Sequence, residues 1–457
     1  MVQMLWLIVL YNMHCRAITS GVPDRFAPSL QSLIEEQPEE MGPRPAISSM
    51  LTLRGFVEHD SYFDTHEGLD ANDGLFYLYP LPKIFDVGGS DILDVPQYNM
   101  TAVQTRVHLG INGPWLGCYK SSGEVSADFT GPGTVNLYTF RLYNAFVDLQ
   151  SDHDEILLGQ YWHPFFIEKC YPSVVSYNAG NPIDIYARDP QLRYTWKHGS
   201  WTFDFIASEQ SQDYQSNGPI GYSGIYLIHA IVPDLTFRFD CSPDAILSMG
   251  GVIDFKRLIP RTINDFGNAV DESMNNVSAV AYMTYKTPAI TYCAKGIYGQ
   301  NLVDQSSIGG YAVSCINPAN DYRTYTPFQT VHGWLDVASN SKKCAPGFFI
   351  GYVKNIGATS CVFLDECDFP IIYGLEPDIT DLPPPYNIAA PIPNVLPVIS
   401  SVFRVSPRIW WNIEQIRFAL ELEYTRATYG MVTHRGTIAN TTPVTNIRLL
   451  LSAYYFF

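Results

Sequence analysis

The side chains best suited to bind a solute are arginines that lie at alternate positions in extended segments near the C-terminus. Arg404, Arg408, Arg417 and Arg448 share the alternate positions that carry the polar side chains of these segments, as do Glu421 and Glu423. A guanidinium group binds a carboxylate through two parallel hydrogen bonds, so a row of arginines opposite carboxylates orients dipolar solutes and favours anions. These residues predict a polar wall that selects small anions. The alternative is that they form structural ion pairs, which keep the interior hydrated without selecting ions.

The same rule of alternation places further charged side chains on the polar side of other segments. These residues are Arg106, Arg193, Arg238, Asp204 and Asp240. We expect all of them to line one water-filled interior. Replacing Arg408 and Arg448 with neutral residues should then move ion preference toward cations.

Motifs of catalysis and of metal or nucleotide binding are missing from the sequence. There is no GxSxG, HExxH, DxDxDG or phosphate-binding glycine loop. The nine cysteines form no CxxC pair, so zinc and redox motifs are also missing. Three histidines are candidate bases, namely His108, His163 and His332, but the sequence identifies no nucleophile for them. A single histidine in the wall of a pore is usually a polar lining residue without a catalytic role. We therefore expect no catalytic residue, metal or cofactor, with a hydrolase as a minor alternative.

The elements that position the arginines show the period of a strand exposed to lipid. In "NIRLLLSAYYFF", residues 446–457, one set of alternate positions is wholly apolar or aromatic and the other carries Asn446 and Arg448. Charged residues make up only 16% of the chain and aromatic residues 14%. No apolar run after the first residues reaches the roughly 18 to 20 residues of a membrane-spanning helix. A chain that crosses lipid without such helices must be a closed β-barrel.

The spacing of candidate strands predicts an all-β fold, a transmembrane antiparallel barrel of about sixteen strands over residues 51–457. The candidate strands lie near 51–63, 98–111, 115–130, 135–149, 155–163, 187–197, 200–208, 233–241, 245–256, 276–286, 290–298, 328–338, 346–355, 400–411, 415–427 and 444–457. Even-numbered connections are tight, beginning with "NGP" at 112, whereas most odd-numbered ones are long. Short periplasmic turns and long extracellular loops are typical of outer-membrane barrels. Aromatic residues beside the turns, among them Trp196, Trp201, Trp410 and Trp411, predict a girdle at the membrane interface.

Two segments precede the predicted barrel. Residues 1–19 contain an apolar run of export-signal length without a preceding Lys or Arg, which we interpret as a degenerate signal peptide; a buried strand is the alternative. Residues 20–50 predict a periplasmic extension with a short helix and a proline-rich linker. The net charge of −17 argues against a nucleic-acid partner.

Several blocks of sequence resemble DcaP-like porins and related outer-membrane porins of the Bacteroidetes. They include "FRLYNAFVDL" from 140, "LLGQYWHP" from 157, "GFFIGYVKNIGA" from 347 and the C-terminal "NIRLLLSAYYFF". The resemblance spans roughly residues 51 to 457. It implies a homotrimeric channel in the outer membrane of a Gram-negative cell, surrounded by outer-membrane lipids, for small solutes such as dicarboxylates. The terminal Phe457 resembles the signal that the barrel-insertion machinery reads.

The resemblance also concerns the third outer loop, about residues 164–185. In the porins that this sequence resembles, the corresponding loop folds into the barrel, which makes Glu168 and Lys169 candidates for the constriction. The alternative is a loop that caps the opening. A different function remains open as well, namely a surface-binding barrel whose interior is plugged by its loops. Conductance would separate these two functions.

Overall fold

The structure is a computed structural model that describes residues 50–131, 137–211, 214–366, 368–375 and 397–457. The predicted signal-like segment and, apart from residue 50, the predicted N-terminal extension lie outside the described residues. Within the described part of the chain, no helix is long and apolar enough to cross a membrane.

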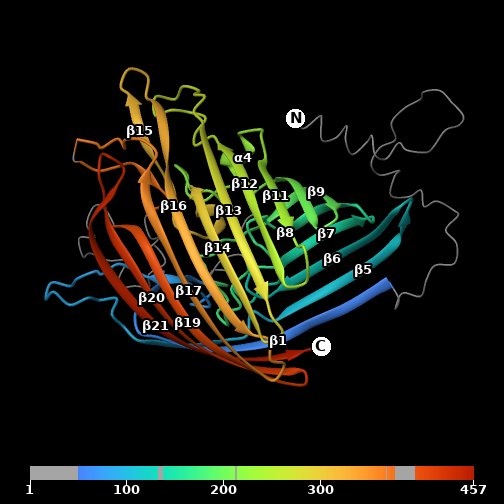
Figure 1. The fold of residues 1–457 in the computed structure, drawn as a ribbon. Coiled ribbons are helices and arrows are strands. Elements are labelled where there is room, and N and C mark those ends of the chain that lie inside the picture. The colour runs from blue at the N-terminus through green and yellow to red at the C-terminus, as the bar shows by residue number, and fades with distance from the viewer. Residues whose placement is uncertain (1–49, 132–136, 212–213, 367, 376–396) are drawn as a thin grey trace, which may run out of the picture. The chain divides into compact units, whose positions relative to one another are not determined.

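One closed antiparallel sheet makes up the barrel (Figure 1). Its described part contains nineteen strands, of which β4 and β5 together form one spanning segment, and β15 and β18 belong to the loops. Sixteen spanning segments remain, which confirms the predicted fold. They are β1 (Leu51–Asp64), β4 (Gln97–Thr101) with β5 (Arg106–Leu116), β6 (Tyr119–Asp128), β7 (Arg141–Gln150), β8 (Asp154–Trp162), β9 (Arg188–His198), β10 (Trp201–Ser208), β11 (Asp234–Cys241), β12 (Leu247–Leu258), β13 (Met274–Lys286), β14 (Ile290–Gln300), β16 (Tyr322–Ser339), β17 (Cys344–Ala358), β19 (Val398–Ile413), β20 (Ile416–Val432) and β21 (Ile438–Phe456).

The connections at the two ends of the barrel differ in length. One end, here called the turn end, carries tight turns at 117–118, 151–153, 199–200, 242–246, 287–289, 340–343 and 414–415. The other end, the loop end, carries most of the long connections, which hold the hairpin of β2 (Gly68–Ala71) and β3 (Phe76–Pro80), the helices α4 (Ile225–Ile228) and η2 (Val303–Gln305), and strands β15 (Tyr311–Asn317) and β18 (Ile372–Tyr373).

The first tight turn lies later in the chain than the sequence predicts. Strands β5 and β6 remain paired beyond Asn112, through an irregularity between Asn112 and Trp115, and they reverse at Gly117. Gly117 has φ of +64°, a conformation that glycine adopts without strain. The prediction of a turn at 112 was therefore wrong, because "NGP" forms a bulge within the strand.

The last strand closes the cylinder by pairing with the first. Strands β1 and β21 pair from Phe56 with Phe456 to Asp64 with Arg448. Backbone hydrogen bonds of 3.0 and 3.1 Å between Gly55 and Phe457 continue this pairing to the last residue. The C-terminus is therefore part of the closing seam.

Side chains alternate across the wall as the sequence predicts. On β21, Ile447, Leu449 and Leu451 are exposed on the outer face, whereas Arg448 and Leu450 are buried inside. Trp196, Trp201 and Trp411 are also exposed near the tight turns. Of the predicted girdle, Trp410 is the exception, because its ring packs against Tyr454 inside the barrel.

Candidate functional site in the barrel interior

At least two of the described connections fold from the loop end into the barrel. The first is the β2–β3 hairpin, which lies against the inner faces of β20 and β21. Arg448 on β21 forms an ion pair with Asp64 at 2.7 Å and donates to Gly74 O at 2.8 Å, and its guanidinium lies 4.5 Å from the ring centre of Tyr77. Arg404 on β19 donates to Leu78 O. These two arginines therefore attach the hairpin to the wall.

The second inward connection is the crossing loop, residues 163–187, between β8 and β9. Lys295 on β14 donates to Phe165 O at 2.6 Å and to Asp184 Oδ1 at 2.5 Å, and the Lys295 and Asp184 side chains are fully buried. Trp334 on β16 donates from Nε1 to the same Asp184 oxygen at 3.1 Å. Burial raises the pKa of Asp184 above its usual range, although Lys295 and Trp334 both favour the charged carboxylate.

The middle of the crossing loop contacts the wall on the side of β19 and β20. Arg408 forms an ion pair with Asp336 at 2.8 Å and donates to Ser173 Oγ. Glu421 accepts from the Val175 N–H, and Glu423 accepts from Asn178 Nδ2 at 3.1 Å.

Apolar side chains support the same position of the crossing loop. Phe165, Ile167 and Ile183 are at most 1% exposed and belong to one apolar cluster with wall residues such as Phe349 and Val402. The loop thus lies inside the barrel and crosses it.

The arginines at the centre of the predicted polar wall are buried and paired. Arg404 is 0% exposed, lies 3.3 Å from Glu423 and donates to Asn181 O as well as to Leu78 O. Arg408 and Arg448 are also buried, against Asp336 and Asp64. Sequence analysis places these side chains inside, where they are found. Their contacts show that they hold the hairpin and the crossing loop, and a role in ion selection stays a prediction.

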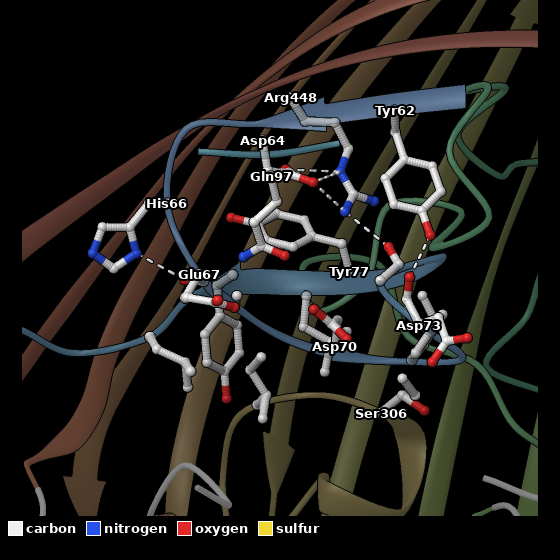
Figure 2. Close-up of a pocket in the computed structure, with 18 of the residues that line it drawn as sticks. Tyr62, Asp64, His66, Glu67, Asp70, Asp73, Tyr77, Gln97, Ser306 and Arg448 are labelled. Atoms are coloured by element: carbon white, nitrogen blue, oxygen red, sulfur yellow. Dashed lines mark hydrogen bonds and ion pairs between the residues drawn. The ribbon is translucent and has the colours of Figure 1, made fainter. Parts of the chain in front are cut away.

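A cavity of about 710 Å³ lies between the hairpin and the outer loops on the loop side (Figure 2). Its lining contains Arg448 with its partner Asp64, the acidic residues Glu67, Asp70 and Asp73, and the rings of Tyr62 and Tyr77. Figure 2 shows Asp70 and Asp73 on the hairpin. This cavity has an acidic lining, and we call it the loop-side cavity.

A second cavity of about 580 Å³ is lined on one side by Trp410, Arg417 and Phe456, near the 414–415 turn, and we call it the turn-side cavity. Its charged lining residues are Arg106, Arg188, Arg417 and Glu168, and its aromatic ones are Phe56, Tyr143, Trp162, Phe166, Tyr171, Tyr177, Tyr186, Trp410, Tyr454 and Phe456. The guanidinium groups stack on rings: that of Arg106 lies 3.5 Å from the ring centre of Tyr143, and that of Arg417 lies 5.0 Å from the ring centre of Trp410. Stacking holds the arginine planes in place. Arg106 Nη2 also lies 3.8 Å from Asp128 Oδ2, and Arg417 Nε donates to Asn412 Oδ1 at 2.6 Å.

The hairpin and the crossing loop separate the two cavities. Tyr77 lines the loop-side cavity, and its carbonyl oxygen accepts from Asn178 Nδ2 at 3.0 Å. The neighbours Ser176, Tyr177 and Ala179 line the turn-side cavity. A solute that crosses the barrel must therefore pass this partition.

The other predicted residues lie apart from the partition. Arg238 forms an ion pair with Asp240 at 2.9 Å and lies 3.7 Å from Asp204, so these three residues form one network on β10 and β11. Arg193 donates to Gln191 Oε1 and to Trp162 O, both at 2.8 Å.

The two predicted constriction residues lie at the start of the crossing loop. Glu168 lines the turn-side cavity and accepts from Tyr161 OH at 2.7 Å. Lys169 is exposed, with Nζ 3.5 Å from Ser242 Oγ. Their effect on permeation stays a prediction.

Sequence reasoning missed several residues of the site. Lys295 and Asp336 lie at inward positions of strands and could have been found by alternation. Asp184 lies in an irregular loop and Arg188 is the first residue of a strand. The alternation of inward and outward side chains along a strand therefore does not identify them.

The comparisons with known proteins show the fold. No family model matches the chain, and no curated protein matches its sequence. The solved structure of the outer membrane channel DcaP of Acinetobacter baumannii is similar, with a TM-score of 0.58, 16% identity and coverage of 89% of this chain and 97% of that one. The anion-selective porin from Comamonas acidovorans has a TM-score of 0.49, 10% identity and coverage of 89% and 99%. OmpT, an outer membrane protein of Vibrio cholerae, has a TM-score of 0.49, 9% identity and coverage of 89% and 97%.

The chain thus has the fold of a multi-pass outer-membrane β-barrel of the porin type. The expected resemblance to DcaP-like porins is confirmed at the level of the fold. A closer relation to porins of the Bacteroidetes stays a prediction.

Proposed function

We propose that this protein is an outer-membrane porin that lets small hydrophilic solutes diffuse passively through a water-filled channel. The observation that carries the proposal is the pair of cavities with charged side chains in their lining, on the two sides of the inward-folded loops and inside one closed barrel. Sixteen strands enclose more space than wall side chains can fill, and inward loops reduce it to a passage of solute size.

The proposed channel favours small anions such as dicarboxylates. Arg106 and Arg417 face the turn-side cavity from opposite sides of the barrel's closing seam, on β5 and β20, and Glu168 is the single acidic residue among the described residues that line this cavity. Arginines fixed by aromatic stacking bind a carboxylate without losing much side-chain freedom. The acidic loop-side cavity lies on the other side of the partition, so the proposed anion preference rests on the arginines of the turn-side cavity.

The proposed channel works as a homotrimer in the lipid of the outer membrane. The exposed apolar outer face supports contact with lipid. Assembly into trimers and delivery by the barrel-insertion machinery through Phe457 rest on the resemblance of the sequence to porins. No catalytic step is part of the proposal.

A surface-binding barrel with a plugged interior is the second candidate function. The buried ion pair of Lys295 with Asp184 favours it, because a loop held by such a pair moves little.

A liposome swelling assay tests the proposal. Proteoliposomes with the full chain should swell in small neutral and anionic solutes, faster for small dicarboxylates than for diamines of the same length. Liposomes with heat-denatured protein are the control. A folded barrel that admits no solute would contradict the porin proposal and support the plugged barrel.

A further inference from the structure

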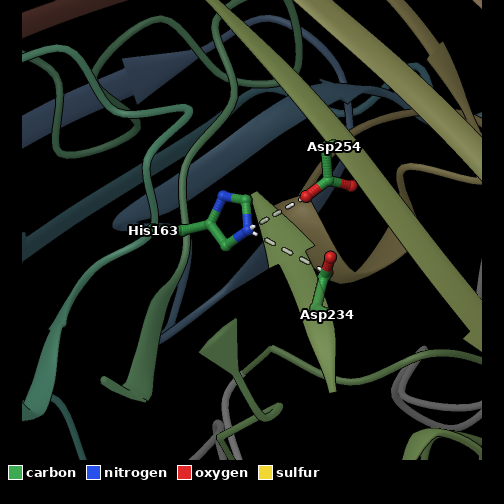
Figure 3. A group of neighbouring side chains, drawn as sticks. All are labelled: His163, Asp234 and Asp254. Atoms are coloured by element: carbon green, nitrogen blue, oxygen red, sulfur yellow. Dashed lines mark ion pairs between the residues drawn. The ribbon is translucent and has the colours of Figure 1, made fainter. Parts of the chain in front are cut away.

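Three side chains that the channel proposal does not use meet at the base of the crossing loop. His163 is the first residue after β8, Asp234 opens β11, and Asp254 lies on the neighbouring strand β12. His163 Nε2 lies 4.0 Å from Asp234 Oδ2 and 4.0 Å from Asp254 Oδ1. Figure 3 shows the imidazole ring directed at both carboxylates. One nitrogen and two carboxylate oxygens thus converge on one point.

One of the converging atoms, His163 Nε2, lacks a hydrogen-bond partner, and so does the second oxygen of Asp234. His163 is 1% exposed and Asp234 is 4% exposed. His163 Nε2 and Asp234 Oδ1 have no hydrogen-bond partner, and Asp254 Oδ1 accepts from Thr236 Oγ1 at 2.9 Å. A buried nitrogen without a partner, aimed at two carboxylates, is destabilising unless a ligand satisfies it.

The charge of the group matches a divalent cation. The neighbouring cation Lys256 is close enough for its charge to act on both carboxylates, but its Nζ contacts Asp304 Oδ1 and donates to Asn301 O at 3.1 Å. Two carboxylates and a neutral imidazole carry two negative charges. Mg²⁺ and Ca²⁺ prefer ligand sets made of oxygen alone, whereas imidazole with carboxylates suits Zn²⁺ and neighbouring transition metals.

We propose that His163, Asp234 and Asp254 bind one divalent transition-metal ion, with zinc as the reference ion and water as a fourth ligand. Bonds of about 2.0 to 2.1 Å in tetrahedral geometry separate ligand atoms by about 3.3 Å, so the three side chains close in from 4.0 Å on binding. His163 Nδ1 accepts a 3.3 Å hydrogen bond from the Phe165 N–H. Coordination through Nε2 moves the ring proton to Nδ1 and gives up this long hydrogen bond.

A bound ion joins the base of the crossing loop to β11 and β12. The loop then has a fixed point at its first residue in addition to its contacts with Lys295 and Trp334. The proposal does not rest on the porin function, since a plugged barrel would bind the metal equally well.

The first test is calorimetric titration of zinc into the full-length folded protein after chelator treatment. One zinc ion per chain should bind, and Asp234→Asn and His163→Gln should each weaken binding by about 10- to 100-fold or more. Asp240→Asn is the matched control, because Asp240 lies on the same face of β11 and pairs with Arg238. Gel mobility without heating shows that each variant still forms a barrel. Unchanged affinity in both ligand variants, or no binding by the unaltered chain, would overturn the proposal.

X-ray absorption at the zinc edge tests the ligands without any substitution. One nitrogen and oxygen neighbours at about 2.0 to 2.2 Å are expected. A sulfur neighbour at about 2.3 Å would assign the zinc to cysteines and overturn the proposed site.

Discussion

At the residue scale, the arginines of the interior divide into two groups by what they contact. Arg404, Arg408 and Arg448 are buried against carboxylates and loop carbonyl groups, so most of their charge is neutralised. Arg106 and Arg417 stack on aromatic rings beside the turn-side cavity, and the carboxylate nearest to Arg106, that of Asp128, lies at the longer distance of 3.8 Å. We therefore expect the second group to act on ions more strongly than the first.

The double substitution Arg106→Gln and Arg417→Gln tests this division. Removing two positive charges from the turn-side cavity should shift the reversal potential across a salt gradient toward cation preference. The shift should be larger at 0.1 M than at 1 M salt, because the Debye length falls from about 10 Å to about 3 Å. Lys342→Gln, in an exposed tight turn, is the charge-matched control for one substitution. An equal shift in the control would remove these arginines from the selective region.

Arg408→Gln should behave differently. It leaves the buried carboxylate of Asp336 without its ion-pair partner and removes a donor to Ser173. Breaking a buried pair in this way costs about 3 to 5 kcal/mol. We expect a lower stability of the folded barrel in urea and larger current fluctuations. A clean change of ion preference with unchanged stability would instead assign Arg408 to the selective region.

At the element scale, the position of the crossing loop depends on the buried pair of Lys295 and Asp184. Lys295→Met should destabilise the folded barrel by about 3 to 5 kcal/mol, because it leaves a buried carboxylate unpaired. The double variant Lys295→Met with Asp184→Asn should recover part of this loss. Denaturant titration of the two variants measures the difference. Equal stability of the single variant and the unaltered chain would contradict the anchoring role.

The stability of the outer loop that contains Glu272 should depend on pH. Glu272 accepts from Arg261 at 2.7 and 2.9 Å and from Tyr325 OH at 2.6 Å. Burial acts to raise the pKa of Glu272, but the hydrogen bonds from Arg261 and Tyr325 outweigh it and lower this pKa below its usual range. A lowered pKa contributes stability that is present above the ordinary value of about 4.3 and is lost as the pH falls through the folded value.

Hydrogen exchange of residues 259–273 measures this dependence. Once corrected for the intrinsic effect of pH, protection should stay constant from pH 7 to about 5 and decrease below about 4. Glu272→Gln should lower protection already at pH 7. Protection that rises on acidification would contradict the assignment.

The strands were predictable from sequence, whereas the interior loops were predictable only in outline. Period-two alternation located each spanning segment, because lipid on one side and water on the other impose it on every strand. The partners of Arg404 and Arg408 were not predictable, because they are loop carbonyl groups and a distant carboxylate brought near by the tertiary fold. The meeting of His163 with Asp234 and Asp254 depends in the same way on three separate elements.

At the scale of the whole molecule, the barrel closes by pairing β1 with β21, and the last residue, Phe457, lies in this closing seam. Deleting Phe457 removes two backbone hydrogen bonds to Gly55 and an aromatic ring at the turn end. We expect less folded barrel in the outer membrane, measured as the heat-modifiable band on a gel. Tyr455→Ala, which alters a neighbouring outward ring and keeps the terminus, is the control. If both variants lose the same amount of folded barrel, the exposed aromatic area of the outer face matters and the terminal residue has no special role.

Single-channel recording of the purified chain in a planar lipid bilayer tests the central claim that the interior is an open, water-filled passage. The account predicts stepwise openings, in groups of three for a trimer, and a reversal potential across a salt gradient whose sign shows anion preference. A folded barrel, verified by its mobility on an unheated gel, that inserts without conducting would contradict the claim and show that the hairpin and the crossing loop plug the interior.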